Sequence, residues 1–405
     1  MRKRGSPPFL LAIGLLLSTA VEADCRATLS TDALQAGIGQ TTVEHLLGEA
    51  RQLDQVLRLD RSQPEFSQTF ADYLDGRADG WRLRRGRRLL QEQHELLAAL
   101  QVRYGITPEI IVALWGLETN FGGNFGSFAV IDALFTLACD GRRSDFFRAE
   151  LLSVLGLVDT GKLDAGQLRG SWTGAMGHMQ FMPSTIAAHA ADHDGSGAYD
   201  LWRSLDDALG SAAAYLQSAG WRAGHAWGEE VELASGFDWS LAGSDRPRPL
   251  IEWRQLGVRP STTRELRGGN DEKAALLLPA GRHGPAFLVY DNFRVLLDWN
   301  ASTFYALAVG ILADRIGGGE GLHRPPPDER ALRRGEIEEI QQRLLALGHD
   351  SGGADGIIGP ATRAAVRSYQ QASGLPADGH PNHELLDHLR NHPAFHATTR
   401  SLATE

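Results

Sequence analysis

Apolar residues recur every three to four positions through most of the chain, which is the spacing of amphipathic helices. This pattern predicts a mainly α (α+β) protein. Helices are expected over residues 41–59, 82–104, 107–122, 132–137, 145–158, 184–191, 205–219 and 298–315. Two stretches between Gly and Pro turns, 231–241 and 286–289, are expected to form short strands. The helix at 82–104 is basic at its start.

The helix expected over residues 107–122 carries an unusual acidic side chain. Thr107 is a good N-cap, a proline follows at the first helical position, and glycines end the helix. Ile111, Leu114 and Glu118 share one face, which is otherwise apolar. Burial and the negative end of the helix dipole both raise the pKa of a carboxyl group, so we expect Glu118 to stay protonated, as a general acid must. On position alone, a glutamate held by an arginine or a backbone N–H is an equal alternative.

The start of the chain predicts export. A basic n-region and a short apolar h-region mark residues 1–23 as a signal peptide, with an uncleaved anchor as the alternative. Without this segment, which holds three basic and one acidic residue, 37 basic and 49 acidic residues remain, a net charge of −12. We therefore expect an exported, periplasmic protein with no nucleic-acid partner, and any attraction of an acidic polymer must be local. The two cysteines, Cys25 and Cys139, either pair in that oxidising compartment or remain free.

Composition divides the chain into a large domain, a linker and a small domain. Residues 317–330 are rich in Gly and Pro, which is typical of a linker. The first domain is expected over residues 24–316 and the second over residues 331–390, with a tail at 391–405. The second domain should be a small three-helix unit, with helices at 336–347, 361–373 and 383–390.

Residues 171–185 form a second unusual stretch, rich in Gly, Ser and Met. Gly174 and Gly177 allow close backbone approach, so a bulky ligand could lie against the loop. Gln180 can both donate and accept hydrogen bonds, as sugar recognition requires. The alternative is a buried connection between helices, with the methionines filling the core.

Together the two stretches resemble the lytic murein transglycosylase B family. The carriers are Trp-Gly-Leu-Glu-Thr-Asn-Phe-Gly at 115–122 and Gly-Ala-Met-Gly-His-Met-Gln-Phe-Met-Pro-Ser at 174–184, and the similarity spans roughly residues 30–316. Residues 331–390 are similar to the peptidoglycan-binding domain type 1, through the segments 340–348 and 355–362. Two independent segments thus indicate the same polymer.

The resemblance implies a lysozyme-like helical catalytic domain with short strands. It also implies cleavage of the MurNAc–GlcNAc β-1,4 bond of peptidoglycan glycan strands, with no cofactor required. Glu118 would act as general acid and then as general base, while the C6 hydroxyl of MurNAc attacks C1 to form a 1,6-anhydro end. One carboxylate suffices because the substrate supplies the nucleophile. Residues expected near the glycan are Ser171, Gln180, Phe181, Tyr215 and Asn292. His178 is assigned no role.

A run of acidic residues after the second stretch resembles the start of a calcium loop, with oxygen ligands at alternate positions. These ligands would be Asp192, Asp194 and Ser196. The twelfth position holds Arg203 in place of the usual glutamate, so Asp206 or Asp207 would complete the site through a longer loop. A structural calcium ion is therefore a candidate, and an Asx-rich turn that caps the next helix is the alternative.

Other readings stay open at this point. The chain could be a hydrolytic muramidase or a catalytically silent peptidoglycan-binding scaffold, and the small domain could be a helical cap. Other cell-wall enzymes are candidate partners. His383 and His388 resemble a zinc-protease pair, but they lie five residues apart rather than four and do not share a helix face.

Overall fold

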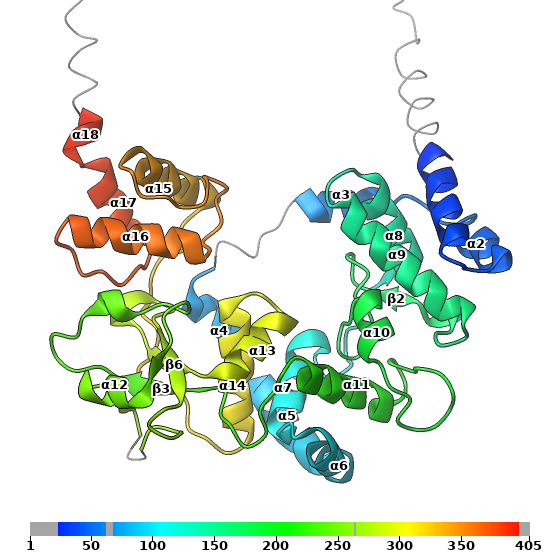
Figure 1. The fold of residues 1–405 in the computed structure, drawn as a ribbon, viewed down its shortest axis with the longest axis horizontal. Helices are drawn as coiled ribbons and strands as arrows, with labels where there is room; N and C mark the ends of the chain where they lie inside the picture. The colour runs from blue at the N-terminus through cyan, green and yellow to red at the C-terminus, as the bar shows by residue number, and fades with distance from the viewer. Residues whose placement is uncertain (1–22, 62–67, 263–264, 397–405) are drawn as a thin grey trace, which may run out of the picture. The chain divides into compact units, whose positions relative to one another are not determined.

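The computed structural model describes residues 23–61, 68–262 and 265–396, and most of them are helical (Figure 1). The chain forms two compact units. The first combines the residues up to Ser62 with Glu118–Tyr215, and the second combines Gln63–Leu117 with the residues from Leu216 onward. Both boundaries beside Leu117 and Tyr215 fall inside helices.

The first unit is built on two long helices that pack along each other. Its helices, after a helical segment at residues 23–35, are α2 (Gln40–Leu46), α3 (Asp54–Arg61), α8 (Val130–Cys139), α9 (Ser144–Asp159), α10 (Pro183–His189) and most of α11 (Leu205–Ser218). Helices α2 and α10 pack on α9, and α3 packs on α8. The strands β1 (Phe128–Ala129) and β2 (Arg169–Gly170) form a short antiparallel ladder. A disulfide joins Cys25 to Cys139, with 5.9 Å between their Cα atoms, which settles the pairing left open above.

The second unit combines helices with an antiparallel sheet. Its first helices are α4 (Phe70–Arg77), α5 (Gly80–Glu92), α6 (His94–Tyr104) and most of α7 (Pro108–Thr119), and α13 (Asp291–Trp299) and α14 (Thr303–Ile316) pack with them. Among the described residues the sheet has the order β4-β6-β7-β3-β5. Its strands are β3 (Gly228–Glu232), β4 (Arg248–Pro249), β5 (Arg259–Pro260), β6 (Lys273–Leu277) and β7 (Ala286–Val289). Helix α12 (Leu250–Gln255) covers the sheet through Trp253, which is fully buried and donates to the carbonyl of Ala274.

Four predicted elements differ from the observed ones. The stretch at 41–59 is two helices, α2 and α3, with no helix over residues 47–53 between them. The stretch at 82–104 is two helices, because Gln93 leaves helical backbone angles between α5 and α6. The stretch at 298–315 likewise divides: Asn300 is extended, and the Ser302 side chain accepts from the N–H of Tyr305 to start α14. Of the strand expected at 231–241, only the start is strand β3, and its end is the short 3₁₀ helix Trp239–Leu241. Periodicity does not detect such breaks, because the apolar face continues across them.

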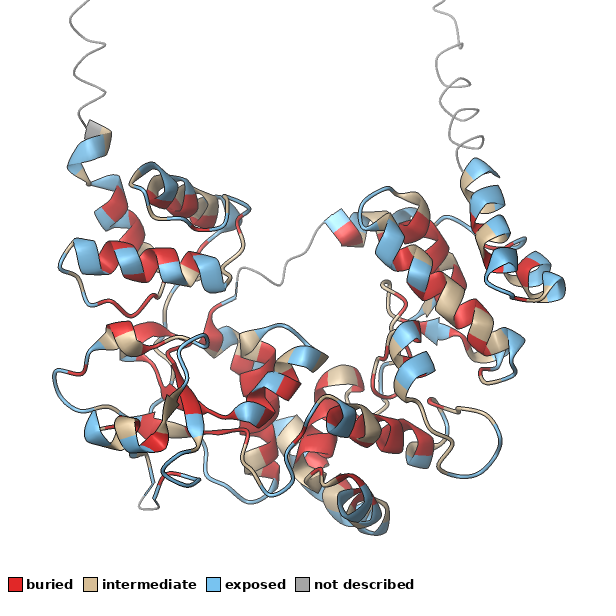
Figure 2. Cartoon of the chain, viewed as in Figure 1, coloured by how far each residue is buried: buried red, intermediate tan, exposed pale blue. Residues whose placement is uncertain are grey.

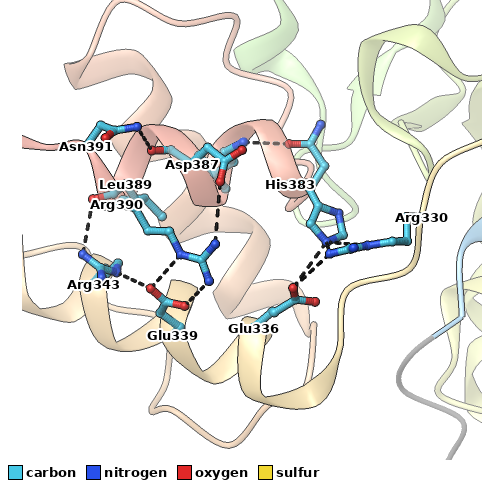
Figure 3. Close-up of polar contacts among 11 residues, drawn as sticks. Arg330, Glu336, Glu339, Arg343, His383, Asp387, Leu389, Arg390 and Asn391 are labelled. Atoms are coloured by element: carbon cyan, nitrogen blue, oxygen red, sulfur yellow. Dashed lines mark hydrogen bonds and ion pairs between the residues drawn. The ribbon is translucent and has the colours of Figure 1, made fainter.

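The C-terminal domain consists of α15 (Arg334–Ala346), α16 (Pro360–Ala372), α17 (His383–Arg390) and the short α18 (Pro393–His396). Its core includes Ile340, Val366 and Leu386, which are fully buried. Figure 3 shows polar contacts between its helices: Glu339 of α15 accepts from Arg390 of α17 at 2.6 and 3.0 Å. The expected three-helix arrangement is therefore present, with one further turn of helix after it.

The Gly/Pro-rich stretch 317–330 is tied to its surroundings within the second unit. The backbone N–H groups of His323 and Arg324 donate to the Glu230 carboxylate, each at 2.8 Å. Further along, Glu329 contacts the imidazole of His380 at 3.0 Å. Composition alone predicts a flexible linker, whereas these contacts hold the stretch in its middle and near its C-terminal end.

Burial follows helix faces in both units, with red buried stripes beside pale exposed ones (Figure 2). No single helix among the described residues has both the length and the apolarity to cross a membrane. Two bent pairs, α6 with α7 and α13 with α14, pass on length and composition only when each pair is taken together.

Candidate active site

Glu118 occupies the last turn of α7 and is half-buried. Ile111 and Leu114, at the preceding positions of the same helix face, are completely buried. The combination expected from the sequence, a carboxyl group at the C-terminal end of an apolar stripe, is therefore present. A half-buried carboxyl group is partly removed from water and still reachable by a ligand.

The backbone after Glu118 is strained. Asn120, Phe121 and Gly122 have φ angles of 52°, 60° and 80°, all in the left-handed region. Only glycine adopts this region without cost, and each other residue loses about 1–2 kcal/mol there. Such strain persists only where surrounding contacts hold it, and it gathers at functional sites.

Thr119 supplies one of those contacts. Its side chain is buried, and its Oγ1 donates to the carbonyl oxygen of His178 at 2.8 Å. The same oxygen accepts from the N–H of Gly122 at 2.9 Å. One hydroxyl therefore joins the strained turn after Glu118 to the loop that contains His178. Sequence reasoning gave Thr119 no separate role, although it lies inside the segment that carries the family resemblance.

The loop after β2 is folded tightly on itself. Met176 and Phe181 exchange backbone hydrogen bonds at 3.0 Å, and Gln180 between them has a φ of 49°. Close approach occurs at Gly174 and Gly177 as predicted, but the neighbouring atoms belong to the protein itself, and in the described part of the chain no open space for a ligand lies beside these glycines. A Cβ on Gly174 would lie 2.5 Å from Leu134, and one on Gly177 would lie 2.7 Å from Leu201.

Four of the five expected substrate residues belong to the same unit as Glu118. The Ser171 Oγ accepts from the N–H of Ala175 at 3.1 Å, and Gln180 Nε2 donates to the carbonyl of Phe125 at 3.1 Å. The rings of Phe181 and Tyr215 lie 6.2 Å apart, with Phe181 buried and Tyr215 half-buried. The structure thus brings loop and helix α11 together, and the binding roles themselves stay predictions.

Asn292, the fifth expected substrate residue, belongs to the second unit. It is fully buried, and its amide closes the turn after Trp221: Oδ1 accepts from the N–H of Arg222, and Nδ2 donates to the carbonyls of Arg222 and His225. In this arrangement its contacts are with the chain itself.

His178, which received no role from the sequence, is packed against the site. Its ring lies 4.8 Å from that of Phe125, edge to face, and a Cβ on Gly122 would fall 2.4 Å from its Cε1. Burial lowers the pKa of His178 to about 4, against an ordinary value of 6.5. The imidazole is therefore neutral at physiological pH, and it packs against the backbone of the turn at Gly122.

The acidic loop brings three carboxylates together. One oxygen from each of Asp192, Asp194 and Asp207 lies within 4.8 Å of the others. Asp207 is fully buried and accepts backbone N–H groups of His193 at 2.7 Å and Asp200 at 3.0 Å. Hydroxyl groups of Ser204 and Ser196 lower the pKa of Asp194. An all-oxygen set of this kind fits a hard cation such as calcium. Of the two residues expected to complete the site, Asp207 lies in the cluster with Asp192 and Asp194.

A helical fold with one acidic side chain at the end of an apolar helix, beside a glycine-rich loop, defines the lysozyme-like class of glycan-cleaving enzymes. Residues 21–314 match the family described as Transglycosylase SLT domain, and residues 333–389 match the family described as Putative peptidoglycan binding domain. The chain belongs to the SLT transglycosylase family and is a peptidoglycan lytic transglycosylase with a C-terminal peptidoglycan-binding domain.

Relatives agree with this assignment. The membrane-bound lytic murein transglycosylase B of Escherichia coli (strain K12) is 32% identical over 295 residues, which cover 69% of this chain and 79% of the relative. The crystal structure of SltB3 from Pseudomonas aeruginosa in complex with NAG-anhNAM-pentapeptide is 44% identical, with a TM-score of 0.88, over 91% of this chain and 99% of that one. The Escherichia coli lytic transglycosylase Slt35 in complex with calcium is 29% identical, with a TM-score of 0.63, over 72% and 92% of the two chains. The expected family and lysozyme-like helical fold are confirmed.

Proposed function

We propose that Glu118 is the single acid and base of a non-hydrolytic cleavage. Protonated Glu118 gives its proton to the glycosidic oxygen as the bond from that oxygen to C1 of MurNAc breaks. The N-acetyl group of MurNAc stabilises the positive charge that develops at C1. Ionised Glu118 then takes the proton of the C6 hydroxyl as O6 bonds to C1. The products are a free GlcNAc hydroxyl and a 1,6-anhydro-MurNAc end, and no water is consumed.

The observation that carries this proposal is the setting of Glu118. A half-buried carboxyl group at the C-terminal end of a helix favours its neutral form, which the first step needs. The strained turn held by Thr119 limits its movement. A relative that is 44% identical was crystallised with NAG-anhNAM-pentapeptide, which contains an anhydro sugar of this type. An anhydro sugar is the product that the proposed reaction yields.

The glycan strand would contact Ser171, Gln180, Phe181 and Tyr215. Asn292, also expected there, is fully buried with its amide bonded to the chain, so its role would be to hold the turn after Trp221. Gln180 and Ser171 offer hydrogen bonds to sugar hydroxyl and amide groups, and the two rings offer apolar contact. Peptidoglycan is the polymer partner in this proposal, and other cell-wall enzymes remain candidate partners.

We further propose a structural calcium ion held by Asp192, Asp194, Ser196 and Asp207. It would brace the loop that precedes α11, and it would take no part in bond cleavage. The Slt35 structure with calcium supports the choice of ion.

We also propose export to the periplasm. The peptidoglycan substrate lies outside the cytoplasm, and the Cys25–Cys139 disulfide suits an oxidising compartment. The predicted signal peptide falls, apart from its last residue, outside the described residues.

Glu118→Gln tests the proposal, because glutamine keeps the shape of the side chain and cannot transfer the proton. We expect product release from purified sacculi to fall by about 10²- to 10⁴-fold or more. The matched control is Glu109→Gln, in the first turn of the same helix, which should keep activity. The masses of the products distinguish the two alternative functions. A hydrolytic muramidase yields glycan ends that are one water heavier than anhydro ends, and a catalytically silent scaffold releases no product. A folded Glu118→Gln variant that still releases anhydro-muropeptides would overturn the assignment.

A further inference from the structure

Helix α5 concentrates arginines in a chain that is otherwise acidic. Six of the 40 basic residues fall between positions 77 and 88, while the formal net charge of the chain is −10. Two of the six serve the fold of the second unit. Arg82 pairs with Asp79 and donates to the carbonyl of Gly116, and Arg87 donates twice to the carbonyl of Arg315.

The outer face of α5 is different. Trp81, Arg84, Arg85 and Arg88 stand at i, i+3, i+4 and i+7, so they share one face, named here the α5 basic face. Trp81 is 51% exposed, and Arg84 and Arg88 are exposed. Neither Arg84 nor Arg88 has an ion-pair partner among the described residues, and Arg85 reaches only Glu92, at 3.5 Å.

This clustering works against the helix. Arg84 and Arg88 are like charges at i and i+4, which destabilise a helix, and nothing described in the chain neutralises them. The apolar side of α5 is used elsewhere, since Gly86 and Leu89 are buried. A large aromatic ring left exposed beside unpaired guanidinium groups is what an anionic ligand with apolar parts would need.

We propose that the α5 basic face is a second binding surface for the peptidoglycan strand, with Arg84 and Arg88 holding carboxylates of the stem peptides. The inference rests on the proposed function, because it takes peptidoglycan as the polymer. Guanidinium groups bind carboxylates in a two-pronged geometry, and stem peptides repeat their carboxylates along the strand. Trp81 covers the apolar parts of the same segment. The face thereby supplies the local attraction that an acidic enzyme needs for an acidic polymer.

The observations favour a carboxylate-bearing polymer over a lipid surface. A helix that lies in a membrane interface presents a broad apolar face beside its basic residues. Here the exposed side of α5 carries one large apolar residue, Trp81, and Leu89 points into the core. A set of arginines with a single aromatic ring is better suited to binding a peptidoglycan strand than a lipid bilayer.

The test measures binding without cleavage. Full-length protein carrying Glu118→Gln is titrated against sacculi, with and without Arg84→Glu/Arg88→Glu. The matched control is Arg259→Glu/Arg294→Glu, which makes the same charge change at exposed positions of the same unit. We expect the half-saturating amount of sacculi to rise about three- to tenfold for the α5 variant, since exposed ion pairs are individually weak. The control should stay within twofold of the parent, and 0.5 M salt should remove the difference.

Further measurements identify the ligand and show whether the variants are folded. Sacculi stripped of stem peptides by an amidase should bind the α5 variant and its parent alike. Arg84→Gln/Arg88→Gln should give a smaller loss in the same direction, with an unchanged melting temperature. Equal losses for the α5 and control variants, or an equal loss on stripped glycan, would overturn the proposal. So would unchanged binding to sacculi with loss of binding to phosphatidylglycerol vesicles, which would assign the face to lipid. Failure of the proposed function would appear separately, as product released by the Glu118→Gln parent.

Discussion

The hydroxyl of Thr119 donates to the carbonyl oxygen of His178, 2.8 Å away, across 59 residues of sequence. Because the same hydroxyl accepts from the N–H of Gly122, it closes the turn that follows Glu118. Three consecutive left-handed residues in this turn would relax if nothing held them. We therefore expect Thr119 to be a positioning residue that acts through the backbone on the carboxyl group of Glu118 beside it.

Replacing Thr119 by valine tests this role, since valine has the same shape without the hydroxyl. One buried and one partly buried backbone group lose their partner, which should lower the free energy of unfolding by about 1–3 kcal/mol. Activity on sacculi should fall further than this loss explains at a temperature where the variant is folded, with the effect in kcat rather than KM. Thr119→Ser, which keeps the hydroxyl, should restore most of kcat. Equal kcat values for the valine and serine variants would leave Thr119 a purely structural residue.

The buried imidazole of His178 predicts a pH dependence of stability. Its pKa is about 4 in the folded protein and ordinarily 6.5, so the unfolded chain binds the extra proton first as the pH falls. The free energy of unfolding should therefore be highest above pH 6.5, decline between pH 6.5 and 4, and level off below. The full contribution is about 3 kcal/mol as an upper value.

Denaturant unfolding at pH 7.5, 6, 5 and 4 checks this expectation. His178→Gln, which stays neutral, should flatten the decline relative to the parent, while His94→Gln at an exposed position should not. Identical pH profiles for the parent and the His178 variant would show that this histidine is not the titrating group.

The helix that contains Glu118 could be predicted from the sequence, and its surroundings only in part. Helix α7 could be predicted because its first-position proline and its apolar stripe lie in one contiguous segment. It ends at Thr119, before the expected terminal glycines, because Asn120 and Phe121 already have left-handed backbone angles. The breaks at Gln93 and Asn300 could not, since the apolar period runs through them while the backbone turns. Local patterns report the face that a helix buries, and they do not report where it bends.

The site divides in the same way. The residues around Glu118 and Gln180 could be found from motifs, because each motif is contiguous. The Thr119–His178 contact and the closeness of Asp207 to Asp192 and Asp194 depend on segments that meet only in the folded chain. The close packing at Gly174 and Gly177 was predicted, and their neighbours, Leu134 and Leu201, agree with the buried connection rather than with a ligand against the loop. A glycine reports close approach, and it does not identify what approaches.

Loss of the Cys25–Cys139 disulfide should destabilise the first unit. The bond spans 114 residues, and a loop of that length restricts the unfolded chain strongly. We expect reduction to lower the free energy of unfolding by about 2–5 kcal/mol. Denaturation with and without a reductant measures the change, and Cys25→Ser/Cys139→Ser should be equally destabilised and indifferent to the reductant. A parent protein whose stability ignores the reductant would contradict the prediction.

Calcium should stabilise the loop formed by Asp192, Asp194 and Asp207. Ion binding to the folded state alone raises the free energy of unfolding by RT ln(1 + [L]/Kd), about 2.7 kcal/mol at a hundredfold excess over Kd. We expect millimolar calcium to raise the melting temperature of chelated protein. Asp192→Asn should abolish the rise, because it removes a negatively charged ligand from the cluster. Asp206→Asn is the matched control, since Asp206 is exposed and lies outside the cluster. If calcium leaves the melting temperature of the parent unchanged, the loop is only a hydrogen-bonded cap for α11. If both variants lose the calcium-induced rise equally, the effect comes from overall charge and not from the cluster.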